Sequence, residues 1–397
     1  MSRITHEEPL VSHLRTICAA CGAAGKRKET RTSAVIVPLG PYHPLLLEPY
    51  ALRLRTHGER IVAASAPVSG YGRRGLLELI AGQPIEDALV VLERVCAHAG
   101  QGYRLALTLA AERATRITAP RSAQLTRVFF AELEMTLSAL WSLSELARAL
   151  NQRTVRAHGL EQRERIFDVA ELATGQRVYW AIAQPGGVRE GIQFQAAREL
   201  VGWLHEVVEF WQAVVGPKGA LRRAAERVDA RQTKIAAVDG EGDSSKASAA
   251  VGPLARDDAR RVAPYDGYRA ITLDWTPLDD LPGGVAEAMS CALRLITRLK
   301  LSHDIMRVCA ETLGDAAPSS ARVALKAGQA SATIQTAHGP ARLDVTLADD
   351  QTITQARLVT SCATALARAS RWLPGRTLAD APTALVSLDI CPSCAEL

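Results

Sequence analysis

The sequence contains no long apolar run. No stretch of its 397 residues approaches the ~20 consecutive apolar residues that a membrane-spanning helix needs. The N-terminus also lacks the basic region followed by an apolar core that marks a secretory signal. We therefore expect a cytoplasmic protein whose contact with any membrane is peripheral.

Aromatic residues and charge of one sign are also scarce. Only 5% of the residues are aromatic, whereas Ala, Leu and Arg are abundant, and these side chains lose little freedom in a helical turn. The net charge of +5 is spread along the chain instead of forming a basic stripe, which gives nucleic-acid binding little support. The eight cysteines lack the dense, regular spacing of a disulfide scaffold, so a reducing compartment is favoured.

The spacing of apolar residues predicts a mainly helical protein. Residues 1–32 are polar and irregular, and we expect a flexible N-terminal segment there. Helical spacing occurs over 84–114, 122–151, 161–174, 193–214, 284–313 and 352–371. Strand-like alternation occurs over 34–38, around a His57-Gly58 turn and over 321–347. The predicted class is α+β, a large helical-bundle core with peripheral antiparallel β strands, and residues 236–253 are predicted to form a surface loop or linker.

The last residues carry the most informative motif, Cys391-Pro-Ser-Cys394. A C-x-x-C pair places two sulfurs within reach of one soft metal ion. By itself such a pair also suits a disulfide, half of a zinc site or no site at all. It gains weight from a segment about 300 residues upstream, Glu93-Arg94-Val-Cys96, which supplies a third thiol.

These two segments resemble the metal-binding motifs of nickel–iron hydrogenase large subunits, E-R-x-C-x-x-C and D-P-C-x-x-C, with Asp389 matching the aspartate. Further fragments follow in the family's order: Gly40-Pro-Tyr-His43-Pro44, Gly70-Tyr-Gly-Arg-Arg-Gly75, Glu132-Leu-Glu134, and parts of 174–189, 251–256 and 264–268. Each fragment alone is weakly specific for the family. Their common order and spacing along the chain make the resemblance specific. From residue 33 to 397, the chain is similar to the family that joins the large subunits of energy-converting (group 4-like) hydrogenases with the D-type subunit of complex I, the NADH-quinone oxidoreductase.

The resemblance implies one hydrogenase large-subunit-like domain over 33–397 and an oxidoreductase function. The chain would dock against a small subunit carrying a 4Fe–4S cluster and handle electrons from it. The complex would lie on the cytoplasmic face of the inner membrane, and its electron acceptor stays open between hydrogen, quinone and another small molecule. Two alternatives remain: a non-catalytic structural subunit, and a quinone-site subunit like that of NADH-quinone oxidoreductase.

The metal motif departs from the hydrogenase pattern in three places. In the family, each C-x-x-C gives one sulfur to nickel alone and shares the other between nickel and iron, and the sulfur missing at Ala99 is a bridging one. Tyr103 stands where the motif has a histidine, and Leu397 stands where precursors carry the residue that directs maturation cleavage. We therefore expect a degenerate site, in which nickel could still bind three thiolates but no standard hydrogen-activating centre forms.

The candidate site combines thiols with nearby polar groups. The metal candidates are Cys96, Cys391 and Cys394, and the catalytic candidates are His43, Glu93, Arg94 and Asp389. The paired motifs predict that Cys96 and Cys394 lie close together in the fold. The alternatives are unreactive buried thiols, a structural His43 and a salt bridge between Glu93 and Arg94.

Other cysteines and one histidine receive plainer expectations. Cys18 and Cys21 are half of a possible metal site, but without a second pair nearby we favour an inert segment. Cys291, Cys309 and Cys362 lie on apolar helical stripes and are expected in the core. His98 is expected to be exposed, because on a helix it would point away from the Cys96 side.

Overall fold

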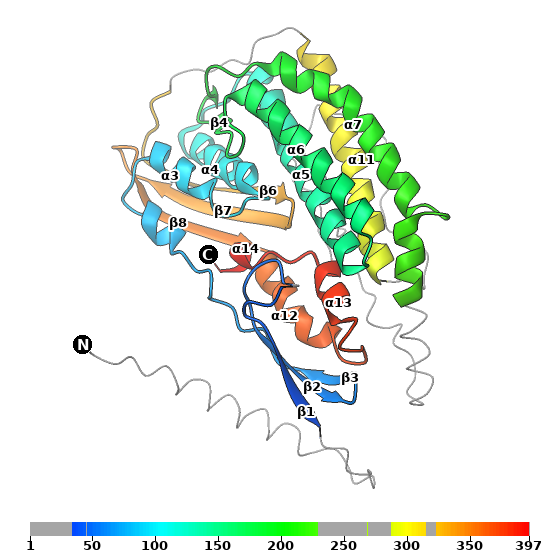
Figure 1. Cartoon of the computed structure of the whole chain (residues 1–397). Helices are drawn as coiled ribbons and strands as arrows, with labels where there is room; N and C mark the ends of the chain where they lie inside the picture. The colour runs from blue at the N-terminus through cyan, green and yellow to red at the C-terminus, as the bar shows by residue number, and fades with distance from the viewer. Residues whose placement is uncertain (1–33, 45, 229–267, 269–286, 315–322, 397) are drawn as a thin grey trace, which may run out of the picture.

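The computed structural model describes residues 34–44, 46–228, 268, 287–314 and 323–396 (Figure 1). The expected N-terminal segment, the loop at 236–253 and the motif fragments between 251 and 267 lie outside these described residues. Within the described ranges, no helix is both long enough and apolar enough to cross a membrane.

Four long helices pack together as a bundle (Figure 1). They are α5 (Arg121–Ala149), α6 (Arg153–Thr174), α7 (Phe194–Val215) and α11 (Glu287–Leu313). Helices α5 and α7 each pack against both α6 and α11. The predicted helical-bundle core is therefore confirmed.

A three-stranded antiparallel sheet lies beside the bundle. Its strands are β6 (Gly328–Thr336), β7 (Gly339–Leu347) and β8 (Ile353–Thr360), in that order. Helix α4 (Gly100–Thr115) packs on β6 and β7 (Figure 1). Buried residues alternate with more exposed ones along β7, as expected for a sheet with one face on the core.

A second sheet packs against the C-terminal helices. It contains β1 (Val35–Leu39), β2 (Leu52–His57) and β3 (Arg60–Ala64), and the β2–β3 turn is the predicted His57-Gly58 hairpin. Helices α12 (Cys362–Trp372) and α13 (Ala381–Ser387) share an apolar cluster with these strands. The cluster includes Leu39, Leu52, Leu54, Ile61, Leu366, Leu373 and Leu385.

The remaining elements are short. They are α2 (Leu76–Ile80), α3 (Ile85–Leu92), β4 (Ala183–Gln184), β5 (Gly187–Val188) and α14 (Pro392–Ala395). The last of these contains the second cysteine of the C-terminal motif.

Two of the predicted helices are wrong in extent. The range 84–114 holds two helices, α3 and α4, separated by a turn. The chain folds back there because Gly100 packs on the backbone of Glu93, where a Cβ would lie only 2.2 Å from the Glu93 carbonyl oxygen. The range 352–371 contains strand β8 before helix α12 begins. Apolar periodicity does not separate a short strand from a helix.

Candidate metal centre

Four potential metal ligands meet between the α3–α4 turn, the β6–β7 turn and the C-terminus. They are Cys96, His338, Cys391 and Cys394, and their ligand atoms all lie within 4.8 Å of one another. The Cys96 sulfur lies 3.4 Å from the Cys391 sulfur and 3.7 Å from His338 Nε2. The cysteines are buried and His338 is half-buried. The proximity expected for Cys96 and Cys394 is therefore present in the structure.

Glu93 fixes the turn that presents Cys96. Its side chain is only 1% exposed and lies 3.2 Å from the guanidinium of Arg104. It also accepts hydrogen bonds from the Gln101 side chain and, at 2.8 Å, from the Ala181 backbone N–H. A buried carboxylate needs such partners, so these contacts hold the turn in one place.

Glu134 of helix α5 receives the first N–H groups of helix α4. Its carboxylate accepts the backbone N–H of Gln101 at 2.8 Å and that of Gly102 at 3.0 Å. Burial raises the pKa of Glu134 to about 8, although the two hydrogen bonds act in the opposite direction. The Glu134 oxygens thus satisfy two of the first N–H groups of the helix that follows the Cys96 turn.

Two glutamates anchor the C-terminal cysteine motif. Glu48 accepts the Ser393 backbone N–H at 2.6 Å, the Ser393 hydroxyl at 2.9 Å and the Cys391 thiol at 3.7 Å. Glu396 accepts the backbone N–H groups at both ends of the segment Gly70–Gly72, at 2.6 and 2.8 Å. The motif is therefore held by residues that lie within the first 100 residues of the chain.

Asp389 links the same motif to the helical bundle. It has a φ of 49°, which is uncommon for a residue other than glycine. It accepts the Ser142 hydroxyl at 2.5 Å and lies 3.8 Å from the buried Arg298. These partners belong to α5 and α11, so the Asp389 carboxylate positions the chain just before Cys391.

The position of His338 follows from the direction of β6 along helix α4. A Cβ on Gly328, at the start of β6, would meet Ala114 near the end of α4. A Cβ on Gly102, in the first turn of α4, would meet Thr336 at the end of β6. The strand therefore runs antiparallel to the helix and delivers the two-residue turn containing His338 to the N-terminal end of α4.

Local contacts then fix the His338 turn. The Ser361 hydroxyl donates to the His338 carbonyl oxygen at 2.7 Å, and the Thr336 hydroxyl donates to the Gly339 carbonyl oxygen at 2.7 Å. Gly339 has a φ of 106°, and a Cβ there would lie 2.3 Å from Ser361 Oγ. No motif of the sequence connects His338 to the cysteines, so sequence reasoning missed it.

The sulfurs and the imidazole change each other's protonation. Hydrogen bonds with Cys391 and Cys394 hold the pKa of Cys96 well below the usual value for a thiol. Burial disfavours charge on His338, but the sulfurs of Cys391 and Cys96 outweigh it and raise the His338 pKa well above its usual value. The cluster thus favours a thiolate beside an imidazolium, and binding of a metal ion would release the imidazolium proton.

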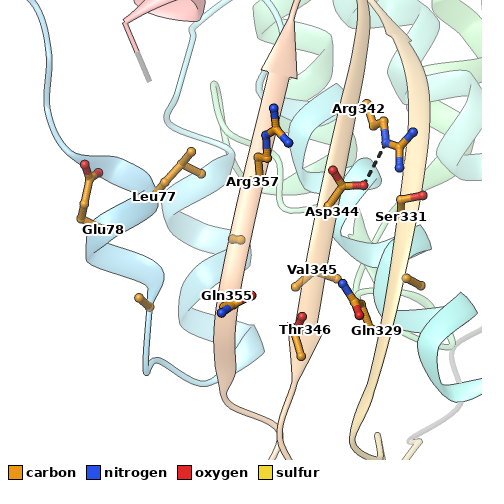
Figure 2. Close-up of a pocket in the computed structure, with 13 residues that line it drawn as sticks. Leu77, Glu78, Gln329, Ser331, Arg342, Asp344, Val345, Thr346, Gln355 and Arg357 are labelled. Atoms are coloured by element: carbon orange, nitrogen blue, oxygen red, sulfur yellow. Dashed lines mark hydrogen bonds and ion pairs between the residues drawn. The ribbon is translucent and has the colours of Figure 1, made fainter.

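The groove on the outer face of the β6–β7–β8 sheet is separate from this cluster (Figure 2). It is formed by α2 and by the three strands, and none of the four ligand candidates lines it. Arg342 pairs there with Asp344 at 2.9 Å, as Figure 2 shows. Its lining contains neither cysteine nor histidine, so the soft-donor chemistry of the described residues lies at the cysteine cluster.

Comparisons with known proteins agree with the family resemblance expected from the sequence. Residues 150–322 match the family described as the respiratory-chain NADH dehydrogenase 49 Kd subunit. The chain is 25% identical over 383 residues to the carbon monoxide-induced hydrogenase of Rhodospirillum rubrum, covering 92% of this chain and 99% of that protein. It is 27% identical to the D-type subunit of the NADH-quinone oxidoreductase of Thermosipho melanesiensis, covering 59% of this chain and 64% of that protein. These matches support the similarity of the chain to hydrogenase large subunits and to their complex I counterpart.

A solved structure shows the same fold. It is a chain of the membrane-bound sulfane sulfur reductase, an archaeal respiratory membrane complex, with a TM-score of 0.76 and 20% sequence identity. The match covers 93% of this chain and all of that one. This chain therefore has the fold of a subunit of that respiratory membrane complex.

By the motif resemblance, Ala99 stands at the position of a cysteine ligand and Tyr103 at the position of a histidine. Ala99 is fully buried at the start of α4 and offers no donor atom. Tyr103 is 1% exposed, and burial, followed by the charges of Cys394 and Cys362, raises its pKa well above the usual value. Its hydroxyl therefore stays protonated, and neither residue replaces the missing thiolate.

The other sequence-predicted residues lie outside the four-ligand cluster. His43 is half-buried in the loop after β1, and Arg94 is exposed with its guanidinium 5.1 Å from the ring centre of Tyr179. The expected exposure of His98 is wrong, because it lies in the turn before α4 rather than on a helix. Its ring is half-buried and stacks on Trp141, and burial lowers its pKa to about 4.

The remaining described cysteines are buried, as expected. Cys291 and Cys309 lie on α11. Cys362 also borders the cluster, since its thiol lies 3.9 Å from the His338 carbonyl oxygen. Cys18 and Cys21 lie outside the described residues.

The donor set does not fit the binuclear centre of hydrogenases. Two metal ions that share two bridging thiolates, with one terminal thiolate pair besides, require four cysteine ligands. Here three cysteines belong to the four-ligand cluster, Ala99 stands at the fourth position of the motif, and the Cys362 thiol contacts Cys394 from outside that set. The fourth donor is an imidazole, and one imidazole nitrogen has a single lone pair, so it cannot replace a bridging sulfur.

Proposed function

We propose that the chain is the large subunit of a membrane-associated, hydrogenase-like or complex I-like oxidoreductase in which the nickel–iron site is degenerate. The observation that carries this proposal is the convergence of Cys96, Cys391 and Cys394 with Ala99 in place of the fourth thiolate. The fold and its paired motifs persist, while the ligand needed to hold iron is missing. Hydrogen activation is therefore not the proposed reaction.

The proposed partner is a small subunit that carries a 4Fe–4S cluster. Apolar side chains are exposed on the loops that anchor the C-terminal motif: Tyr42, Leu47, Val68 and Tyr71 are 80%, 37%, 51% and 44% exposed. These loops contain Glu48 and Gly70–Gly72, which hold the cysteine segment from outside. An apolar patch beside a buried site favours docking of another protein. Membrane association would then come through the partner subunits.

In this arrangement, electrons would pass between the partner's cluster and a small acceptor near the cysteine site. The names of the relatives include a quinone oxidoreductase, a hydrogenase and a sulfane sulfur reductase. We therefore propose a quinone or a sulfur compound as the acceptor. Hydrogen is disfavoured because the site lacks the fourth thiolate that the binuclear centre needs.

The candidate catalytic residues would mainly position this site. The carboxylates of Glu93 and Asp389 already bind Arg104 and Ser142, respectively, so we assign them to holding the Cys96 turn and the C-terminal segment. Arg94 and His43 would lie at the edge of the site. Substitution of Arg94 or His43 would weaken binding of the acceptor and leave the metal content of the chain nearly unchanged.

Purification of the chain from its native membranes tests the proposal. We expect an iron–sulfur subunit to copurify with a tagged chain and to give the electron paramagnetic resonance signal of a reduced 4Fe–4S cluster. Tyr71→Asp should reduce this copurification because it places a charge in the exposed apolar patch. Leu172→Asp, at a position 68% exposed on helix α6, is the matched control. A wild-type chain that purifies as a monomer without iron would contradict the proposal.

The runner-up function is a non-catalytic structural subunit of the same kind of complex. It is favoured by the same missing ligand at Ala99. Reduction of the partner's cluster followed by stopped-flow oxidation separates the two functions. If the oxidation rates with quinone and with polysulfide are the same for the isolated iron–sulfur partner and for its complex with this chain, the chain has no part in electron delivery.

A further inference from the structure

We propose that Cys96, His338, Cys391 and Cys394 form a mononuclear metal site that takes a single zinc ion, with His338 as the fourth ligand. The inference deepens the proposed function and rests on it, because this site would replace the binuclear centre of a hydrogenase large subunit. Its structural basis is a set of residues from three separate parts of the chain whose ligand atoms converge within 4.8 Å.

Two of the donor–donor distances are close to those of a tetrahedral zinc site. Zinc–sulfur bonds of ~2.3 Å and zinc–nitrogen bonds of ~2.0 Å at tetrahedral angles separate two sulfurs by about 3.8 Å, and a sulfur and a nitrogen by about 3.5 Å. The Cys96 sulfur lies 3.4 Å from the Cys391 sulfur and 3.7 Å from His338 Nε2. Both separations differ from the tetrahedral values by a few tenths of an ångström. Small side-chain shifts would therefore complete the site.

His338 is held in position by the fold and not by the cysteines alone. The β6–β7 turn is closed by the Ser361 hydroxyl and by the packing of β6 along α4. The imidazole is thus presented to the sulfurs before any ion binds. Its Nδ1 atom is buried and has no hydrogen-bond partner among the described atoms. The Nε2 atom, which lies 3.7 Å from the Cys96 sulfur, is the nitrogen that would bind the ion.

The donor types select zinc over the metals of the family. Three thiolates and one imidazole form a common structural zinc site, which is four-coordinate and closed. Nickel(II) is found more often in square-planar sites, and most iron–sulfur clusters are held by four thiolates, one more than the three that converge at this site. The combination of three thiols and one imidazole therefore favours zinc.

A zinc ion here would have a structural consequence. It would join the Cys96 turn, the β6–β7 turn and the C-terminal segment, three pieces that are otherwise tied by Glu93, Ser361 and Glu48. Zinc does not change its oxidation state, so electrons from the partner's cluster would reach an acceptor without passing through this ion.

The test compares two histidines that lie side by side. The ring centres of His98 and His338 are 6.3 Å apart, and only His338 is among the four ligand candidates. Wild-type complex, His338→Ala, His338→Cys and His98→Ala are each purified and analysed for zinc, nickel and iron per chain. X-ray absorption at the zinc edge then counts the sulfur and nitrogen neighbours of the ion.

We expect one zinc per wild-type chain at this site, with three sulfur neighbours and one nitrogen neighbour. Loss of a residue that hydrogen-bonds to a metal ligand typically weakens metal binding 10–100-fold. Loss of the ligand itself in His338→Ala should therefore speed zinc release to a chelator at least ~10-fold. His98→Ala should release zinc as slowly as the wild type. His338→Cys should retain zinc with four sulfur neighbours, which also controls for misfolding of the alanine variant.

Three outcomes would overturn the inference. The first is nickel and iron in equal amounts, with the infrared bands of cyanide and carbon monoxide, which would establish the binuclear centre. The second is a three-sulfur, one-nitrogen shell that persists in His338→Ala. The third is a wild-type chain without metal whose thiols at the site react freely with a thiol reagent. Copurification of the iron–sulfur partner is measured on the same samples, so failure of the zinc site is distinguishable from failure of the proposed function.

Discussion

Glu48→Ala should release the C-terminal cysteine segment from the rest of the fold. The Glu48 carboxylate accepts the Ser393 N–H at 2.6 Å and the Ser393 hydroxyl at 2.9 Å. A hydrogen bond to a charged group contributes about 1.5–3 kcal/mol. Because Glu48 is half-buried, we use the lower value for each bond, and the local stability lost is about 3 kcal/mol.

Hydrogen exchange of the C-terminal peptide measures this loss. Since each 1.4 kcal/mol corresponds to tenfold in an equilibrium constant, the Ser393 amide should exchange about 100-fold faster in Glu48→Ala. Helices α5 and α6 should exchange as in the wild type, because the hydrogen bonds of Glu48 described above go to the C-terminal segment and not to these helices. Glu48→Gln keeps one oxygen acceptor and should give an intermediate rate.

The matched control is Glu78→Ala. Glu78 pairs with Arg73 on the surface, where both side chains are about 60% exposed. Such pairs are screened by solvent, so the C-terminal peptide should exchange at the wild-type rate. Equal exchange of the Ser393 amide in Glu48→Ala and Glu78→Ala would refute the role assigned to Glu48.

Three further predictions concern buried contacts of the helices. Glu112→Ala should destabilise the protein by about 3–5 kcal/mol in urea unfolding, because it leaves the fully buried Arg127 guanidinium without its carboxylate; an effect below about 1 kcal/mol would contradict this. Gly159→Ala should destabilise it by about 1–3 kcal/mol, since a Cβ would lie 2.8 Å from Trp211; an unchanged melting temperature would count against the packing of α6 described above. Glu134 has a pKa of about 8 when folded, so its protonated form stabilises the fold fully below its unfolded pKa, and this contribution is lost as pH rises towards 8. Glu134→Gln should therefore remove the decrease in the free energy of unfolding between pH ~4.5 and 8. A variant whose stability falls with pH in parallel with the wild type would contradict the raised pKa of Glu134.

The long helices and the family were predictable because their signals are local or follow the order of the chain. Repeated apolar spacing over many turns gives α5 and α11 within a few residues. The cysteine motifs gave the meeting of Cys96 with Cys394, since shared coordination requires it. Boundaries that depend on contacts across the fold were not predictable in the same way. The break before α4 exists because Gly100 packs on Glu93, and an unbroken apolar period does not reveal that contact.

The candidate site was predicted only in part. His338 joins the cysteines because β6 runs antiparallel to α4, a relation that no spacing between His338 and Cys96 expresses. Glu48 lies close to the Gly40–Pro44 motif, yet its role is visible only when its contacts with Ser393 are known. Glu93 was expected to pair with Arg94 in one interpretation, but the buried cation beside it is Arg104.

The most direct test of the central claim is hydrogen turnover by the intact complex, measured together with its nickel content. The claim is that this hydrogenase large-subunit fold lacks the hydrogen-activating centre because Ala99 replaces a bridging thiolate. It predicts no hydrogen uptake or evolution above background and nickel far below one atom per chain, even when the partner's iron–sulfur cluster is fully present. Hydrogen turnover with one nickel per chain would contradict it.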